Sequence, residues 1–246
     1  MQYLKKGSKK LLNAWAFYDW ANSVYPLVVT TAIFPTFYEA VTSQKGEDGA
    51  LITDKVEFFG YLFSNTELYS YVISASFLVV SFLSPLLSGL ADFWGNKKFF
   101  LKLFCYVGAI SCGSLYFFNV DYLELSMISV FTASIGFWGS LVFYNAYLPE
   151  IAEPEDHDKL SAQGFSMGYI GSALLLIGIL LLIMIGGMNA RYSFPIVMVW
   201  WIGFAQYTFL KLPTYTNESH HEKANLWKGI QELKKVWNEL KHITLI

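Results

Sequence analysis

Charged side chains are absent from six long segments of this 246-residue chain. The segments are residues 20–38, 68–91, 103–120, 125–149, 160–190 and 192–210. A helix rises about 1.5 Å per residue, so about 20 apolar residues cross the ~30 Å hydrocarbon core of a bilayer. Each segment is close to that length or longer. The pattern predicts a polytopic helical membrane protein and excludes a soluble enzyme, a nucleic-acid-binding protein and a disulfide-stabilised scaffold.

The composition of these segments narrows the class further. Barrel strands alternate apolar and polar residues over about ten positions, which these segments do not. All four His residues lie outside the segments, and no metal-binding spacing or catalytic Ser/His, paired-Asp or His-Glu-x-x-His arrangement occurs within them. We therefore expect that the chain is not an enzyme and uses no cofactor or metal. Cys105 and Cys112 are expected on one buried face of the third span.

The distribution of Lys and Arg predicts how the spans are oriented. Short cytoplasmic connections of membrane proteins carry an excess of these residues. Here 14 of the 17 lie before the first span, in alternate connections or after the sixth span, and the opposite connections hold Lys45, Lys55 and Arg191. We expect six spans with both ends of the chain in the cytoplasm, in a plasma membrane or a bacterial inner membrane.

Three regions follow from this topology. Residues 1–12 form a basic cytoplasmic N-terminus, residues 13–212 a six-helix transmembrane bundle, and residues 213–246 a cytoplasmic linker. In the linker, apolar residues recur at steps of four and three, which predicts a basic amphipathic helix on the cytoplasmic leaflet or against helix ends; they are Leu226, Ile230, Leu233, Trp237 and Leu240. The apolar residues 243–246 are expected to begin a truncated seventh span.

Asp19 is the acidic residue expected inside the first span. It lies about six residues, or ~9 Å, from the cytoplasmic start of the helix. A carboxylate at such depth costs about 2–3 kcal/mol, so it normally faces the bundle interior or a water-filled cavity. Asn22 and Pro26 follow on the same helical face. Two interpretations remain open: Asp19 and Asn22 contact a substrate or a proton, or Asp19 hydrogen-bonds a neighbouring helix.

A second polar group lies near the cytoplasmic ends of the fourth and fifth spans. Asn145 ends the fourth span and Gln163 opens the fifth. These residues either line a substrate path or join helices by hydrogen bonds. The fifth span also carries glycines on one face, which predicts close packing against another helix, with a lining role as the alternative; they are Gly164, Gly168, Gly171 and Gly178.

The connection between the second and third spans carries a motif. It reads Ser88-Gly89-Leu90-Ala91-Asp92-Phe93-Trp94-Gly95-Asn96-Lys97-Lys98. This order resembles the loop signature of the major facilitator superfamily, although Ser88 replaces a usual glycine and Phe93 a usual arginine. The resemblance implies that four residues form a cytoplasmic gate against the opposite half of a transporter: Asp92, Gly95, Lys97 and Lys98.

Three further stretches are similar to the vacuolar amino-acid effluxer family, whose fungal members export amino acids from the vacuole. They are Trp15-Ala16-Phe17-Tyr18-Asp19-Trp20-Ala21-Asn22-Ser23, the Phe34-Pro35 step, and Leu148-Pro149-Glu150 followed by Ser161-Ala162-Gln163-Gly164 and Gly168-Tyr169-Ile170-Gly171. The resemblance implies a twelve-span, all-α transporter of two six-span halves around a central cavity that opens alternately to each side. This chain would supply the N-terminal half.

The leading hypothesis is a secondary active transporter of small organic solutes, with amino acids as one candidate class. Its expected partners are a small-molecule substrate, membrane lipids, a C-terminal six-span half and a proton as coupling ion, with no nucleic acid. A rival hypothesis is a non-transporting scaffold or receptor that signals through the basic tail. A half-size transporter in which two chains pair is a further alternative to a fragment.

Overall fold

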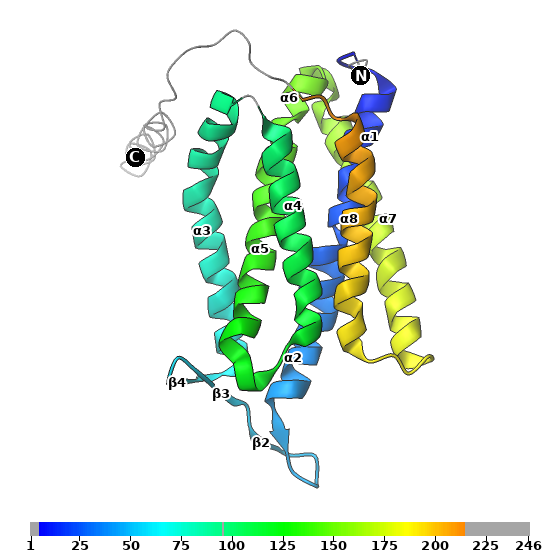
Figure 1. Cartoon of the computed structure of the whole chain (residues 1–246). Helices are drawn as coiled ribbons and strands as arrows, with labels where there is room; N and C mark the ends of the chain where they lie inside the picture. Colours follow the sequence, from blue (N-terminus) through cyan, green and yellow to red (C-terminus); the bar gives the residue numbers. More distant parts are fainter. Residues whose placement is uncertain (1–4, 95, 215–246) are drawn as a thin grey trace, which may run out of the picture.

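The computed structural model describes residues 5–94 and 96–214, and for residues 88–94 it describes the backbone alone. In this part of the chain, six helical segments are long and apolar enough to cross a membrane: Lys9–Thr42, Asn65–Leu87, Lys97–Phe117, Val120–Ile151, Pro154–Met184 and Ala190–Lys211. They run side by side in one bundle (Figure 1). The six-span helical fold predicted from the charge-free segments is thereby confirmed.

Five of the six spans are built on one long helix each. These are α3 (Asn65–Trp94), α4 (Lys97–Ser114), α5 (Leu123–Ala146), α7 (His157–Met184) and α8 (Ser193–Lys211). Short helical turns extend or join them: η2 (Leu115–Phe117), η3 (Val120–Tyr122), α6 (Leu148–Ile151), η4 (Pro154–Asp156) and η5 (Ala190–Tyr192). Their brevity makes neighbouring spans antiparallel.

The first span is irregular, because it changes helix type twice. It comprises α1 (Lys9–Asn22), a π-helical segment η1 (Tyr25–Ile33) and α2 (Phe34–Thr42). Pro26 has no backbone N–H to donate, and its carbonyl accepts hydrogen bonds from the hydroxyls of Thr30 at 2.7 Å and Thr31 at 2.8 Å. Side-chain hydroxyls of this kind satisfy backbone groups that an apolar environment leaves without partners.

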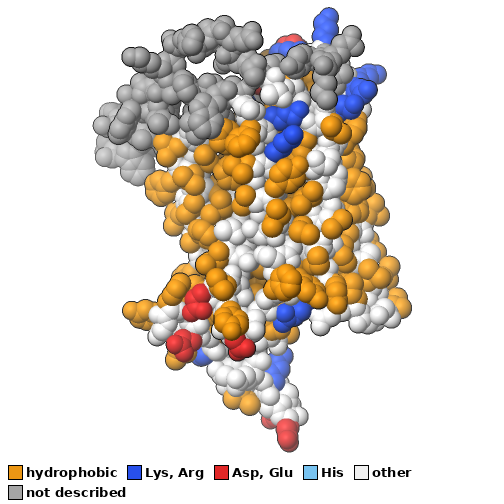
Figure 2. All heavy atoms as spheres, viewed as in Figure 1, with side chains coloured by type: hydrophobic (Ala, Val, Ile, Leu, Met, Phe, Trp, Pro, Cys, Tyr) orange, Lys and Arg blue, Asp and Glu red, His pale blue; other side chains and the backbone are white. Residues whose placement is uncertain are grey.

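Contacts between helices place the spans in the order α3, α5, α4, α8, α1 and α7 around the bundle. The two helices at the ends of this order, α3 and α7, are the least covered by the rest of the protein. In the most apolar stretch of each span, 11% of the residues are buried in α3 and 22% in α7, whereas 39% or more are buried in each of the other spans. Figure 2 shows apolar side chains over the sides of the bundle, with charged side chains gathered at its ends. The bundle therefore has one open side between α3 and α7.

The connection between the first two spans forms two β-hairpins, which the sequence analysis did not anticipate. β1 (Gln44–Lys45) pairs with β2 (Leu51–Thr53), and β3 (Lys55–Phe58) pairs with β4 (Tyr61–Ser64). They lie at the end of the bundle opposite the N-terminus (Figure 1). The tight turn between β3 and β4 has positive φ angles at Phe59 and Gly60. Strands of two to four residues are too short for alternation of side chains to reveal them.

Two glycines let α4 and α5 pack closely. A Cβ atom added at Gly136 would overlap the backbone of Gly108, and one added at Gly108 would lie 2.8 Å from the ring of Trp201 in α8. Trp201 is fully buried at this junction. Small residues permit such close approach between membrane helices. Three helices therefore meet at the Gly108–Gly136 contact.

We expect Gly136→Ala to reduce the stability of the bundle by about 1–3 kcal/mol, because the added methyl group forces two helix backbones apart. Gly203→Ala is the matched control, since a Cβ atom at Gly203 in α8 meets open space. Thermal unfolding in detergent should show a lower midpoint for Gly136→Ala only. Equal midpoints would contradict a tight α4–α5 contact.

Candidate functional site

Asp19 lies at the wall of a cavity of about 420 Å³ between the first span, α5 and α7. The side chain is 6% exposed. The other polar groups at the wall are those of Asn22, Ser23, Thr31 and Ser172, and the aromatic ones are Phe137, Trp138, Phe165 and Tyr169. The cavity thus combines one carboxylate with hydroxyl groups, an amide and aromatic rings.

The Asp19 carboxylate is held by α5. The Tyr144 hydroxyl donates a hydrogen bond of 2.9 Å to Asp19 Oδ2. The Tyr144 ring is stacked on Trp15 with centroids 4.2 Å apart, and Trp15 Nε1 donates to the Tyr144 carbonyl oxygen at 2.9 Å. In the part of the chain that the structure describes, no Lys, Arg or His side chain pairs with Asp19. The two interpretations of Asp19 are therefore compatible, because it bonds a neighbouring helix and also lines a cavity.

Glycines of α7 make room for these groups. A Cβ atom at Gly164 would overlap Asp19 Oδ2, and one at Gly168 would overlap the hydroxyl of Ser23. At Gly171 an added Cβ atom would lie 2.9 Å from the ring of Trp20. All three glycines are buried on the side of α7 that faces the first span. The glycine face predicted from the sequence lies against the site, whereas Gly178 has open space around it.

Asn22 contributes an unused hydrogen-bond donor. Its side chain is 1% exposed, and its Nδ2 atom has no hydrogen-bond partner among the described residues 5–94 and 96–214. Its Oδ1 atom accepts a long hydrogen bond of 3.4 Å from the Ser23 hydroxyl. A buried donor without a partner costs about 1–3 kcal/mol, so a carbonyl, carboxylate or hydroxyl oxygen entering the cavity would be bound favourably.

The other two residues expected on the path lie elsewhere. Asn145 is exposed near the end of α5. Gln163 donates a hydrogen bond of 3.0 Å from Nε2 to Asn13 Oδ1 and lines a separate cavity with Phe17 and Tyr207. The structure thus brings Asp19 and Asn22 together but places neither Asn145 nor Gln163 at their cavity.

Ion pairs join the helix ends on the side of the N-terminus. Lys97 Nζ lies 2.6 Å from Glu150 Oε1, and Lys98 Nζ donates to the Leu212 carbonyl oxygen at 2.8 Å. Lys6 and Glu153 form a longer pair of 3.4 Å. These contacts connect the start of α4 to α6 and to the end of α8.

Several residues named from the sequence fall outside the described part. Gly95 and the linker residues 215–246, with the expected amphipathic helix, are among them, and for Asp92 only the backbone is described. The contributions of Asp92 and Gly95 to a gate therefore remain predictions from the loop signature.

Sequence reasoning missed the aromatic and hydroxyl residues of the site. Tyr144 and Trp138 lie in a charge-free stretch of α5 with no polar periodicity, and Ser172 is one of many serines in the spans. The step of four residues from Gly168 to Ser172 would have placed that hydroxyl on the glycine face. Nothing comparable marks Tyr144, since its role depends on the α1–α5 contact.

The chain matches known proteins over most of its length. The model of the family described as "Vacuole effluxer Atg22 like" matches residues 7–246. The MFS-type transporter YxiO of Bacillus subtilis (strain 168) is 32% identical over 249 residues, which cover 98% of this chain and 54% of the relative. Autophagy-related protein 22 of Coccidioides immitis (strain RS) is 22% identical over 285 residues, which cover 80% of this chain and 47% of the relative. No solved structure gives a significant match.

The chain spans about half the length of the curated relatives that it matches. Its six apolar helices agree with a multi-pass membrane protein, and the relatives are named as an MFS-type transporter and an autophagy-related protein. The loop signature and the family motifs found in the sequence are consistent with the same assignment. The chain belongs to the Atg22-like vacuole effluxer family, a branch of the MFS-type membrane transporters.

Proposed function

We propose that this chain is one six-span half of a secondary active transporter that moves small organic solutes, amino acids among them, by alternating access. A C-terminal six-span half would complete the central cavity against the open side between α3 and α7. Two observations support this arrangement: the chain spans about half the length of its relatives, and the cavity at Asp19 is lined by the first span, α5 and α7.

The observation that carries the proposal is the Asp19 carboxylate at the wall of a cavity between membrane spans. One hydrogen bond from Tyr144 compensates only part of the cost of burying a negative charge. An ammonium group of a solute or a proton would neutralise the rest. Asp19 is therefore the contact for a cationic group of the substrate or for the coupling proton, and Asn22 Nδ2 is a donor to the same solute.

The cytoplasmic gate would form at the N-terminal side of the bundle. Lys97 and Glu150 are partly exposed there, at 21% and 29% of their side-chain surface, so water and an opposing half can reach them. In this proposal the Lys97–Glu150 pair holds the α3–α4 connection against α6, while Asp92 and Gly95 of the loop signature contact the other half. The proposal puts both ends of the chain in the cytoplasm of a plasma or bacterial inner membrane, and the excess of Lys and Arg on that side supports this orientation.

We expect Asp19→Asn to reduce solute flux at least about tenfold, because the amide keeps the shape but not the charge that attracts a cation. The complete transporter in proteoliposomes, supplied with radiolabelled amino acids and primary amines with and without a pH gradient, is the assay. Asp121→Asn is the control, since Asp121 lies in η3 and is exposed.

Unchanged flux in Asp19→Asn would remove Asp19 from the mechanism. A wild-type protein that moves none of the solutes in the assay would favour the scaffold or receptor function instead. Loss of the pH-gradient dependence alone would assign Asp19 to the proton.

Gly164→Ala is expected to reduce flux about as strongly as Asp19→Asn while the protein still folds. The added methyl group would displace the Asp19 carboxylate from its bond with Tyr144. Gly178→Ala on the same helix is the matched control, because its Cβ atom would meet open space. Flux should be compared with the thermal midpoint of each variant. If both variants retained flux, the position of the carboxylate would not matter.

Lys97→Met and Glu150→Gln are each expected to change the transport rate while lowering stability by no more than about 1 kcal/mol, because partly exposed ion pairs contribute little to stability. If the pair acts as a unit, the double variant should transport at the rate of the slower single variant. Initial rates of flux and unfolding midpoints of the four proteins test this. Additive effects would contradict a shared gate contact.

A further inference from the structure

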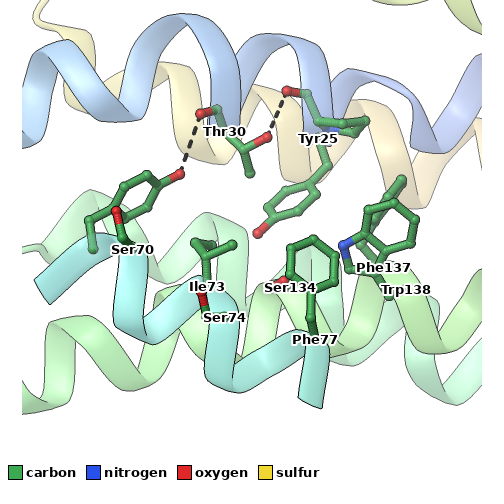
Figure 3. A pocket seen from close by; sticks show the side chains of 11 residues that line it. Tyr25, Thr30, Ser70, Ile73, Ser74, Phe77, Ser134, Phe137 and Trp138 are labelled. Atoms are coloured by element: carbon green, nitrogen blue, oxygen red, sulfur yellow. Dashed lines mark hydrogen bonds between the residues drawn. The ribbon is translucent and has the colours of Figure 1, made fainter. Parts of the chain in front are cut away.

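A second cavity of about 420 Å³ lies beside the Asp19 cavity, between η1, α3 and α5. The two cavities share three wall residues, Pro26, Phe137 and Trp138. Figure 3 shows side chains from the π-helical segment and from α3 and α5 pointing toward one another across this space. Pro26, at the start of the π-helical segment, therefore separates two compartments that border on the same aromatic residues.

Among the residues that the structure describes, no charged side chain lines the second cavity. Its polar groups are the indole N–H of Trp138 and the hydroxyls of Tyr25, Thr30, Tyr69, Ser70, Ser74 and Ser134. Aromatic rings form the rest of the wall: the ring centroids of Phe77 and Trp138 lie 5.2 Å apart, and those of Phe137 and Trp138 5.1 Å apart. This compartment suits an uncharged group and would penalise an ion.

Most of the hydroxyls already have partners within the protein. Thr30 donates to the Pro26 carbonyl oxygen, and Tyr69 donates to the Thr30 carbonyl oxygen at 3.3 Å. Ser134 and Ser76 share a hydrogen bond of 2.7 Å. These bonds hold the cavity wall in place and occupy the donors of Thr30 and Tyr69.

Tyr25 differs from these residues. Its side chain is 2% exposed, yet its hydroxyl makes no hydrogen bond to any residue that the structure describes. In Figure 3 the ring projects from the π-helical segment into the cavity, with its hydroxyl toward α3 and α5. The ring is positioned by Phe137, at 5.4 Å between centroids, and by Trp201, at 5.6 Å. A rigidly placed hydroxyl without a partner is a ready contact for a polar group in the cavity.

We infer that this second cavity is the subsite for the uncharged end of the transported solute, and that Tyr25 recognises a hydroxyl group there. The inference rests on the proposed function, and on the first of its two roles for Asp19, the contact with a cationic group of the solute. Six residues separate Asp19 from Tyr25, a rise of ~9 Å along a helix. The solute class is then a primary ammonium compound with an aromatic or aliphatic body that carries a hydroxyl group.

Two probes with the same ammonium end test the selectivity: tyramine, which carries a phenolic hydroxyl, and phenethylamine, which lacks it. Affinities are measured by titration calorimetry with the complete transporter in lipid nanodiscs. The wild type should bind tyramine more tightly than phenethylamine. Tyr25→Phe should lower the tyramine-to-phenethylamine affinity ratio about fivefold to tenfold, the effect of one hydrogen bond to a buried group.

Tyr38→Phe is the matched control. Tyr38 also belongs to the first span, is also 2% exposed, and its hydroxyl has no partner in the described part of the chain, but it lines neither cavity. The affinity ratio should stay at the wild-type value in this variant. An equal ratio in the wild type and Tyr25→Phe, or an equal shift in Tyr38→Phe, would overturn the subsite.

Cysteine labelling provides a readout that does not depend on the affinity ratio of the two amines. Ser74→Cys in the cavity wall should react with a water-soluble methanethiosulfonate reagent, and tyramine should protect it. Ile110→Cys on α4 is the control. Ile110 is exposed on the outer surface of a membrane span, which faces lipid and not water, and it lines neither cavity. The native Cys105 and Cys112 are fully buried and contribute little background. Reaction of Ser74→Cys no faster than that of Ile110→Cys would overturn the proposal.

The experiments distinguish a failure of the proposed transport function from a failure of the proposed subsite. Asp19→Asn should weaken binding of both amines equally and leave their ratio unchanged. If Asp19→Asn abolished flux while Tyr25→Phe left the ratio unchanged, the transport function would stand and the subsite would be wrong. If Tyr25→Phe changed the ratio while Asp19→Asn left flux intact, the subsite would stand and the role of Asp19 would be wrong.

Discussion

The hydrocarbon core of a membrane offers no hydrogen-bonding partner, so a polar group within a span costs free energy unless it finds a partner in the protein. Helices satisfy their own backbones, and the side chains of this bundle follow the same constraint across helix contacts. Trp15 donates to the backbone of Tyr144, Trp200 to that of Trp20, and Thr208 to that of Ala14. These bonds join α1 to α5 and α8, and the bond from Trp15 ties together two of the helices that line the Asp19 cavity.

The first span departs from regular α-helical geometry at several points. Pro26 is the second residue of its π-helical segment, and the hydroxyls of Thr30 and Thr31 donate hydrogen bonds to the Pro26 carbonyl oxygen. The Asp19 carboxylate lies buried about two turns earlier. Such irregular helix segments are frequent at functional sites. Because Pro26 borders both cavities, the break in the helix separates a charged compartment from an uncharged one. The helix therefore departs from ideal geometry at the same point at which the neighbouring cavity changes from a charged to an uncharged lining.

Close packing places the functional groups with little freedom to move. Gly164 and Gly168 bring α7 so near to α1 that an added methyl group would meet Asp19 or Ser23. The Gly108–Gly136 contact does the same for α4 and α5 on the far side of the bundle. Glycine loses more conformational entropy than other residues in a helix, and its use here is explained by the contact that it permits. A bundle packed this way holds Tyr144 against Asp19 without relying on flexible side chains.

The exclusion of charge from six segments was enough to determine the number of spans, because burying a charge in hydrocarbon is costly at any position. The same argument singled out Asp19, and the helical period placed Asn22 beside it. The sequence could not determine which helix would meet that face. Tyr144, Trp138 and Tyr25 have no charge or period that marks them, and Asn145 and Gln163 lie away from the cavity although they are polar and close in sequence to the motifs. Only the tertiary structure decided these positions, since contacts between helices depend on how whole surfaces fit and not on the local preference of any one residue.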